Sequence, residues 1–137
     1  EFEMVATGVG RELKLGNDLA ILTIGTAGNF AAEAIANVEQ EGKHTIAHYD
    51  LRFAKPLDEK LIAEVTAKFD KVITVEDGVL RGGVGEAVAA LLARNNLHPR
   101  ITNLGIDDRF VEHGKPMELY AECGYDEESL LGLLDSE

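Results

Sequence analysis

Leu19-Ala20-Ile21-Leu22-Thr23-Ile24, closed by Gly25, is the stretch that decides the fold of this chain. It is a nearly continuous apolar run, which is typical of a β-strand covered on both faces. A helical pattern follows directly, because apolar residues then recur at the spacing of one helix face until Gly42 ends the helix. A buried strand followed by an amphipathic helix predicts one unit of an α/β fold. The apolar residues of this helix face are Phe30, Ala34, Ile35 and Val38.

The same alternation continues along the chain. Because parallel strands are joined by right-handed crossovers, it predicts a three-layer α/β/α sandwich around a mainly parallel sheet of four to five strands. Residues 11–15 are a candidate for an antiparallel strand at the edge of this sheet. The other predicted strands are 44–51, 72–75 and 101–104, and the other predicted helices are 58–69, 84–92, 116–124 and 126–134.

Length and composition indicate a single globular domain. The chain has 137 residues, 45% of them hydrophobic, which excludes intrinsic disorder and is enough for one core. No secretory leader opens the sequence, and Cys123, the single cysteine, cannot form an internal disulfide. Because the first residue is not Met, we expect a processed or engineered piece of something longer. Residues 1–10 are predicted to be a linker or an engineered remnant, and residues 11–137 the domain.

The charge of the chain excludes two classes of partner. Its net charge is −12, which repels the phosphates of nucleic acids and anionic membrane surfaces. The chain also lacks Trp, so that a surface for base stacking is not expected. We therefore predict no nucleic-acid partner and no membrane partner.

A glycine cluster, Gly82-Gly83-Val84-Gly85, lies between a predicted strand and a predicted helix. Backbone N–H groups and the helix dipole can hold an anion at such a place, and Asp107 mimics the ribose-binding acid of a dinucleotide fold. The dinucleotide fingerprint nevertheless fails at its third glycine, where Val88 stands, and no Lys-Ser/Thr pair completes a phosphate-binding loop. The cluster therefore favours close packing of a helix start against the sheet.

The histidines do not form a convincing metal site. His44 and His48 are four residues apart, which on a strand means roughly 13 Å, too far to share one ion. His98 precedes Pro99 in a turn, and His113 lies in a loop where a hydrogen-bonded role is expected. We predict no metal site.

The sequence also shows no suitable nucleophile for covalent catalysis. The only two serines, Ser129 and Ser136, lie in the acidic tail outside any nucleophile elbow, and Cys123 is expected in the core.

Polar residues gather where the predicted parallel strands end. The segments 25–28, 50–53 and 76–78 each follow a strand at the sheet edge that carries the binding crevice in open α/β folds. Arg52 and Glu76 are candidates for an ion pair across this crevice, with Thr26 beside them. An ion pair that holds the loops together is favoured over a ligand site.

Three segments resemble one known family over nearly the whole chain. Residues 50–58, DLRFAKPLD, resemble a signature of the transketolase C-terminal domain, and residues 75–85, VEDGVLRGGVG, are similar to a second. Within that family, residues 104–114, LGIDDRFVEHG, most resemble the 1-deoxy-D-xylulose-5-phosphate synthases. The departures are small: Asp77-Gly78 replaces the more usual Glu-Asn, and Lys115 stands where a capping Ser or Thr is common.

This resemblance implies a piece of an enzyme that uses thiamine diphosphate and Mg²⁺. In the synthases, pyruvate is decarboxylated and condensed with glyceraldehyde 3-phosphate, and the cofactors lie between two other domains. The resemblance therefore implies no catalytic residue and no bound cofactor in this chain, a structural role within a cytoplasmic homodimer, and the remaining domains as partners. Two alternatives stay open: the corresponding domain of a transketolase or a 2-oxoacid dehydrogenase beta subunit, and a stand-alone α/β ligand-binding module.

A domain of a larger enzyme is expected to expose the surface that packs on its neighbours. We predict this surface at the strand ends, where Phe53 and Phe110 are the informative residues because each lies in a loop motif. The full candidate set for the crevice or interface is Thr26, Arg52, Phe53, Glu76, Arg81, Gly82, Gly83, Arg109, Phe110 and His113.

Overall fold

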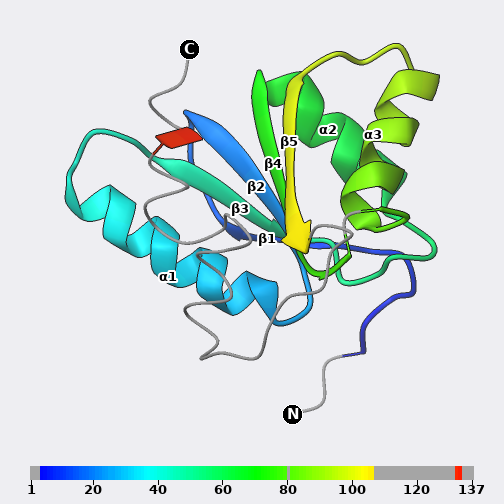
Figure 1. Cartoon of the computed structure of the whole chain (residues 1–137), viewed down its shortest axis with the longest axis horizontal. Coiled ribbons are helices and arrows are strands. Elements are labelled where there is room, and N and C mark those ends of the chain that lie inside the picture. Colours follow the sequence, from blue (N-terminus) through cyan, green and yellow to red (C-terminus); the bar gives the residue numbers. More distant parts are fainter. Residues whose placement is uncertain (1–3, 80, 107–131, 134–137) are drawn as a thin grey trace.

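A computed structural model describes residues 4–79, 81–106 and 132–133 of the chain. Five strands form one sheet in the order β1-β3-β2-β4-β5 (Figure 1). Four of them are parallel: β2 (Leu19–Ile24), β3 (Ile46–Asp50), β4 (Lys71–Val79) and β5 (Arg100–Ile106). β1 (Arg11–Lys14) runs antiparallel to β3 at one edge. The predicted sheet and its antiparallel edge strand are confirmed.

Helices cover both faces of the sheet. α1 (Ala27–Gln40) lies on one face, and α2 (Glu59–Lys68) and α3 (Val84–Arg94) lie on the other (Figure 1). The central strand β2 shows why, because its alternate residues point to opposite faces. Leu19 and Ile21 belong to the core on the α1 side, whereas Ala20 and Leu22 belong to the core on the side of α2 and α3. The three-layer sandwich is therefore confirmed.

β4 is longer than the sequence predicted. Its parallel pairing with β5 continues to Val79 and Ile106 after an irregularity in register beyond Val75. Residues 76–78 are thus part of a strand, because β5 extends far enough to pair with this end of β4.

The predicted C-terminal helices lie outside the described residues, except for two positions. Gly132 and Leu133 are helical, and Leu133 packs against the core on the α1 side. Among the helices of the described part, none has the length and hydropathy that a bilayer crossing requires.

The topology of the sheet singles out the ends of β2 and β4. From β2 the chain passes through α1 to β3 on one side, and it then crosses to β4 on the other side of β2. The direction of winding therefore changes between β2 and β4. In open α/β sheets, ligands bind beside the carboxyl ends of the strands at this point.

Candidate functional site at the strand ends

The start of α3 is occupied by a carboxylate of the chain itself. Glu76, on β4, is buried with 5% of its surface exposed. Its Oε1 accepts from the Val84 N–H at 3.1 Å, and its Oε2 accepts from the Gly85 N–H at 2.7 Å. These are N–H groups that a helix N-terminus offers to an anion. The anion position suggested by the glycine cluster is thus filled from within.

Gly85 lies in close contact with the sheet. A Cβ at this position would be 2.6 Å from Thr74 Oγ1 and 2.7 Å from Asn103 Cγ. Those two side chains are themselves joined across β4 and β5, since Thr74 Oγ1 donates to Asn103 Oδ1 at 2.6 Å. The predicted packing role of the glycine cluster is confirmed at Gly85.

The start of α1 is built differently. Gly25, with φ +70°, turns the chain from β2 into the helix, and the Thr26 side chain does not cap the helix. Thr26 Oγ1 instead donates to Asp77 Oδ2 on β4 at 2.9 Å. The first turn of α1 contains no acidic residue. The first turn of α1 therefore supplies no carboxylate to the space beside the start of this helix.

An open crevice of about 290 Å³ lies between these two strand ends. Ile24, Gly25 and Thr26 line it from the β2 side, and residues 76–78 line it from β4. Its two carboxylates already have partners, because Glu76 accepts from α3 and Asp77 accepts from Thr26. The crevice thus lies between the turn after β2 and the end of β4, and the two carboxylates in its lining are already engaged within the domain.

A buried polar pair supports the first turn of α1. Thr23 and His48 are 1% and 2% exposed, and Thr23 Oγ1 lies 2.8 Å from His48 Nε2. A Cβ at Gly28 would be 3.1 Å from the same hydroxyl. Burial lowers the pKa of His48, and the nearby Asp50 opposes this effect without cancelling it. The spacing of the histidines in the sequence bears only on metal binding and does not indicate this buried contact of His48. The contact could have been inferred from the two residues lying on neighbouring strands with both side chains buried.

Arg52 and Phe53 lie in the loop after β3. Arg52 has φ +60°, and its backbone N–H donates to Asp50 Oδ1 at 2.9 Å, which fixes this left-handed turn. Phe53 is partly buried. The expected ion pair between Arg52 and Glu76 is not among the interactions of the described residues, because Glu76 is directed to α3.

The remaining candidates are distributed as follows. Arg81 and Gly82 are exposed in the turn before α3, and Gly83 is the N-cap residue of that helix. The Gly82 N–H donates to Glu86 Oε2 at 2.9 Å. Within the described part of the chain, no group of three or more His, Cys, Asp or Glu residues has metal-binding geometry. Arg109, Phe110 and His113 lie outside the described residues.

Known proteins resemble this chain in sequence and in fold. A 1-deoxy-D-xylulose-5-phosphate synthase from Bacteroides fragilis is 48% identical over 93% of the chain, and one from Phocaeicola vulgatus is 48% identical over 96%. The chain covers 20% and 21% of these two proteins, about a fifth of their length. A solved structure described as a split-gene transketolase, inactive β4 tetramer, superimposes with a TM-score of 0.83 at 28% identity. It matches 95% of this chain and 42% of its own.

The match to a family model extends over most of the domain. Residues 8–130 fit the model described as the transketolase C-terminal domain. This range includes the five strands β1 to β5 and the three helices α1 to α3, together with the glycine-rich starts of α1 and α3. The chain therefore belongs to the transketolase C-terminal domain family.

Proposed function

We propose that this chain is the C-terminal domain of a 1-deoxy-D-xylulose-5-phosphate synthase. The observation that carries the proposal is the 48% identity to such synthases over 93% of the chain, combined with coverage of only a fifth of their length. The complete enzyme would be a thiamine-diphosphate-dependent transferase that condenses pyruvate with glyceraldehyde 3-phosphate. The cytoplasm is its proposed location.

The proposed role of this domain is structural. Thiamine diphosphate carries a diphosphate that needs free N–H donors and a metal. The described residues do not fit it. The start of α3 is filled by Glu76, and the carboxylates of the crevice have protein partners. At the start of α1 the N–H groups of Gly28 and Asn29 donate to the carbonyls of Gly25 and Thr26, both at 3.1 Å. We therefore place cofactor binding and Mg²⁺ binding in the other domains of the enzyme.

The proposed partners of the domain are those other domains and a second subunit of a homodimer. The candidate contact surface is the strand-end edge with Thr26, Arg52, Phe53 and Arg81. Support comes from the fold, since α/β sheets present their recognition loops at this edge. Phe53 is an apolar side chain of this edge that its own domain covers only in part.

The experiment compares the full-length enzyme with two pieces, this 137-residue chain and the enzyme without it. Each sample receives pyruvate and glyceraldehyde 3-phosphate, with thiamine diphosphate and Mg²⁺, and formation of the deoxyxylulose product is measured. We expect product from the full-length enzyme, none from the isolated chain, and a large loss when the domain is removed.

Two outcomes would overturn the proposal. The first is a full-length protein that transfers a two-carbon unit between sugar phosphates and does not use pyruvate, which would indicate a transketolase. The second is micromolar binding of thiamine diphosphate and Mg²⁺ to the isolated chain, measured by calorimetry, which would move cofactor binding into this domain.

A further inference from the structure

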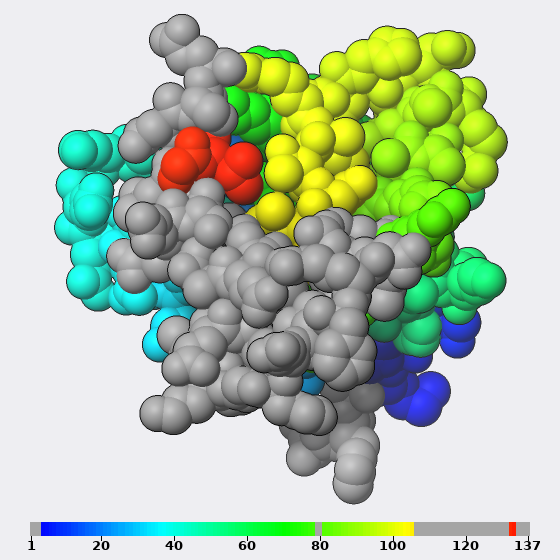
Figure 2. All heavy atoms as spheres, in the orientation of Figure 1, coloured from blue at the N-terminus to red at the C-terminus, as the bar shows by residue number. Residues whose placement is uncertain are grey.

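The strand β5 forms an outer edge of the sheet. It pairs with β4 on one side, and no strand of the described residues lies on its other side. Figure 2 shows atoms of β5, in yellow, at the surface beside those of α3. An edge strand presents a row of main-chain N–H and C=O groups with which another extended segment can pair. The outer side of β5 is therefore a candidate surface for strand addition.

The opposite edge of the sheet is protected in ways that β5 is not. β1 has four residues, its register with β3 shifts between Glu12 and Lys14, and Lys14 is engaged by Glu39. Short length, irregular pairing and charges turned onto the fold are usual protections of an edge strand. β5 has seven residues, contains no lysine or proline, and pairs regularly with β4 from Arg100 to Leu104.

An apolar groove of about 230 Å³ lies between the start of β5 and the end of α3. Leu97 and Ile101 in its lining are only partly buried, although both pack against the core on this side of the sheet. The groove is smaller than the roughly 300–1,000 Å³ pockets that hold small-molecule ligands, and it suits single side chains of a bound segment. Its apolar lining includes Leu92, Ala93, Leu97, Pro99 and Ile101.

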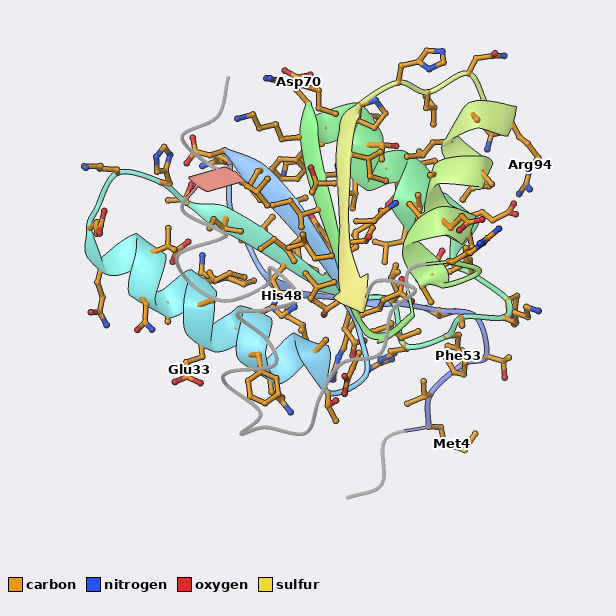
Figure 3. All side chains as sticks on the ribbon, viewed as in Figure 1. Met4, Glu33, His48, Phe53, Asp70 and Arg94 are labelled. Atoms are coloured by element: carbon orange, nitrogen blue, oxygen red, sulfur yellow. The ribbon has the colours of Figure 1, made fainter. Side chains whose placement is uncertain are left out.

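The groove belongs to an acid-free stretch of an acidic chain. Residues 87–106 contain no Asp or Glu, although the whole chain has 25 of them. His98 lines the groove, and the exposed Arg100 follows it two positions later at the start of β5. Figure 3 shows this start of β5 between Asp70, on the β4 side, and Arg94, on α3. The local charge therefore favours an acidic segment over a basic one.

We propose that the outer side of β5 and the groove beside it bind an extended peptide segment of another protein, in which acidic residues flank an apolar side chain. Main-chain hydrogen bonds to β5 supply affinity, and the groove selects the apolar side chain. The carboxylates of the segment lie near Arg100 and His98. A second copy of this chain is a poor occupant, because two molecules of net charge −12 repel each other.

The position of the groove keeps this inference separate from the proposed function. The groove lies where β5 begins, whereas the surface proposed to contact the other domains lies where the parallel strands end. These are opposite ends of the sheet, so that a neighbouring domain on the strand-end edge leaves the groove open.

The probe is a displayed library of random short peptides without proline, selected on the 137-residue chain. We expect the selected peptides to alternate acidic and apolar residues and to bind with dissociation constants below about 100 μM. A selection that yields no such peptide would overturn the proposal.

Two variants on α3 test whether a selected peptide uses the groove. Ala93→Glu places a carboxylate and added volume in the groove, and Ala90→Glu makes the same change outside its lining. Both alanines are exposed, so neither change removes core contacts. We expect the dissociation constant to rise at least about tenfold for Ala93→Glu and less than about twofold for Ala90→Glu. Equal effects of the two variants would place the peptide elsewhere and overturn the proposal.

Pairing with β5 is tested by N-methylation of the selected peptide at alternate amides, in two registers. In a strand that adds to an edge, alternate N–H groups point toward the neighbouring strand. We expect at least about a tenfold loss of affinity in one register and little change in the other. Equal affinities in both registers would refute strand addition. Binding to the isolated chain that is lost in the full-length enzyme would overturn the choice of another protein, in favour of a segment of the same enzyme.

Discussion

The starts of α1 and α3 share the packing of a glycine on the preceding strand, and they differ in whether a carboxylate of the domain binds the helix start. Each helix follows a parallel strand through a glycine-rich turn, and each packs a glycine on a threonine of that strand, Gly28 on Thr23 and Gly85 on Thr74. Each threonine is bonded to the next strand outward, Thr23 to His48 and Thr74 to Asn103. Only at α3 does a buried carboxylate, that of Glu76, reach the helix N–H groups.

The difference shows what a glycine-rich turn does and does not indicate. The glycines permit close approach of helix and strand at both places, although the contact is tighter at Gly85 than at Gly28. Whether the helix start can take an external anion is decided by a different residue, which comes from the strand. At α3 the protein supplies this anion itself, whereas α1 opens on the crevice beside Asp77.

The largest effect is expected from Glu76→Ala. This change leaves the N–H groups of Val84 and Gly85 without their acceptor in a buried place, which should lower the free energy of unfolding by about 2–3 kcal/mol. Glu76→Gln keeps one carbonyl oxygen and should cost about 1 kcal/mol. Urea melts measure both values. If Glu76→Ala were as stable as the parent, the two helix starts would be energetically equivalent and the comparison would fail.

A smaller effect is expected from a matched pair of glycine substitutions. Gly85→Ala forces a methyl group to within 3 Å of Thr74 and Asn103, both of which are fixed by their mutual hydrogen bond, and should destabilise by about 1–2 kcal/mol. Gly28→Ala meets a single atom at 3.1 Å. There the gain in helix propensity, about 1 kcal/mol, should offset the contact. Thermal unfolding of both variants tests this order, and equal losses would contradict it.

The buried threonine pairs should differ in their response to pH. Because burial places the pKa of His48 below its ordinary value of 6.5, the unfolded chain takes up the proton first as the pH falls. The stabilisation by the Thr23–His48 pair is therefore complete above pH 6.5 and decreases as the pH falls toward the folded pKa. The slope for one proton is at most about 1.4 kcal/mol per pH unit.

The measurement uses His48→Asn, with Asn103→Ala as the matched variant at α3. The difference in unfolding free energy between the parent and His48→Asn should shrink between about pH 7.5 and pH 5.5. The corresponding difference for Asn103→Ala should stay constant, since neither partner of that pair titrates in this range. If the difference in unfolding free energy stayed constant with pH for both variants, the titration of His48 would not affect stability, and the two buried pairs would not differ in their response to pH.

The smallest effect is expected at the open crevice. Thr26→Ala removes the exposed hydrogen bond to Asp77, and we expect a change of no more than about 0.5 kcal/mol. A loss comparable to that of Glu76→Ala would mean that the crevice, like the start of α3, is a structural element of the fold.

Sequence patterns predicted the layers of this molecule better than its contacts. The strand at residues 19–24 and the helix after it were recognisable because burial on two faces and on one face leave different periodicities. The edge strand was predicted at residues 11–15 and is present as β1. Phe53 and Arg52 were placed correctly at a strand end, because loops follow strands in sequence order.

The role of Glu76 could not be predicted in the same way. The two N–H groups that donate to Glu76 belong to residues eight and nine positions later in the chain. A turn separates them from the strand, and its length alone does not determine where the helix starts. The extension of β4 to Val79 depends on pairing with β5, which comes some thirty residues later in the chain. The Thr23–His48 pair likewise needed the register between β2 and β3, since periodicity shows which face a residue occupies but not its neighbour.

The antiparallel position of β1 has a consequence for how the protein is made. Its register pairs Arg11 with Asp50, so β1 leaves the ribosome well before the strand on which it will lie. During that interval Leu13 and Leu15 have no sheet beside them, and β1 can take its place only after β3 has been made. The pairing of β2 with β3 closes a shorter loop than the pairing of β1 with β3. We therefore expect β1 to be the later of the two strands to join β3.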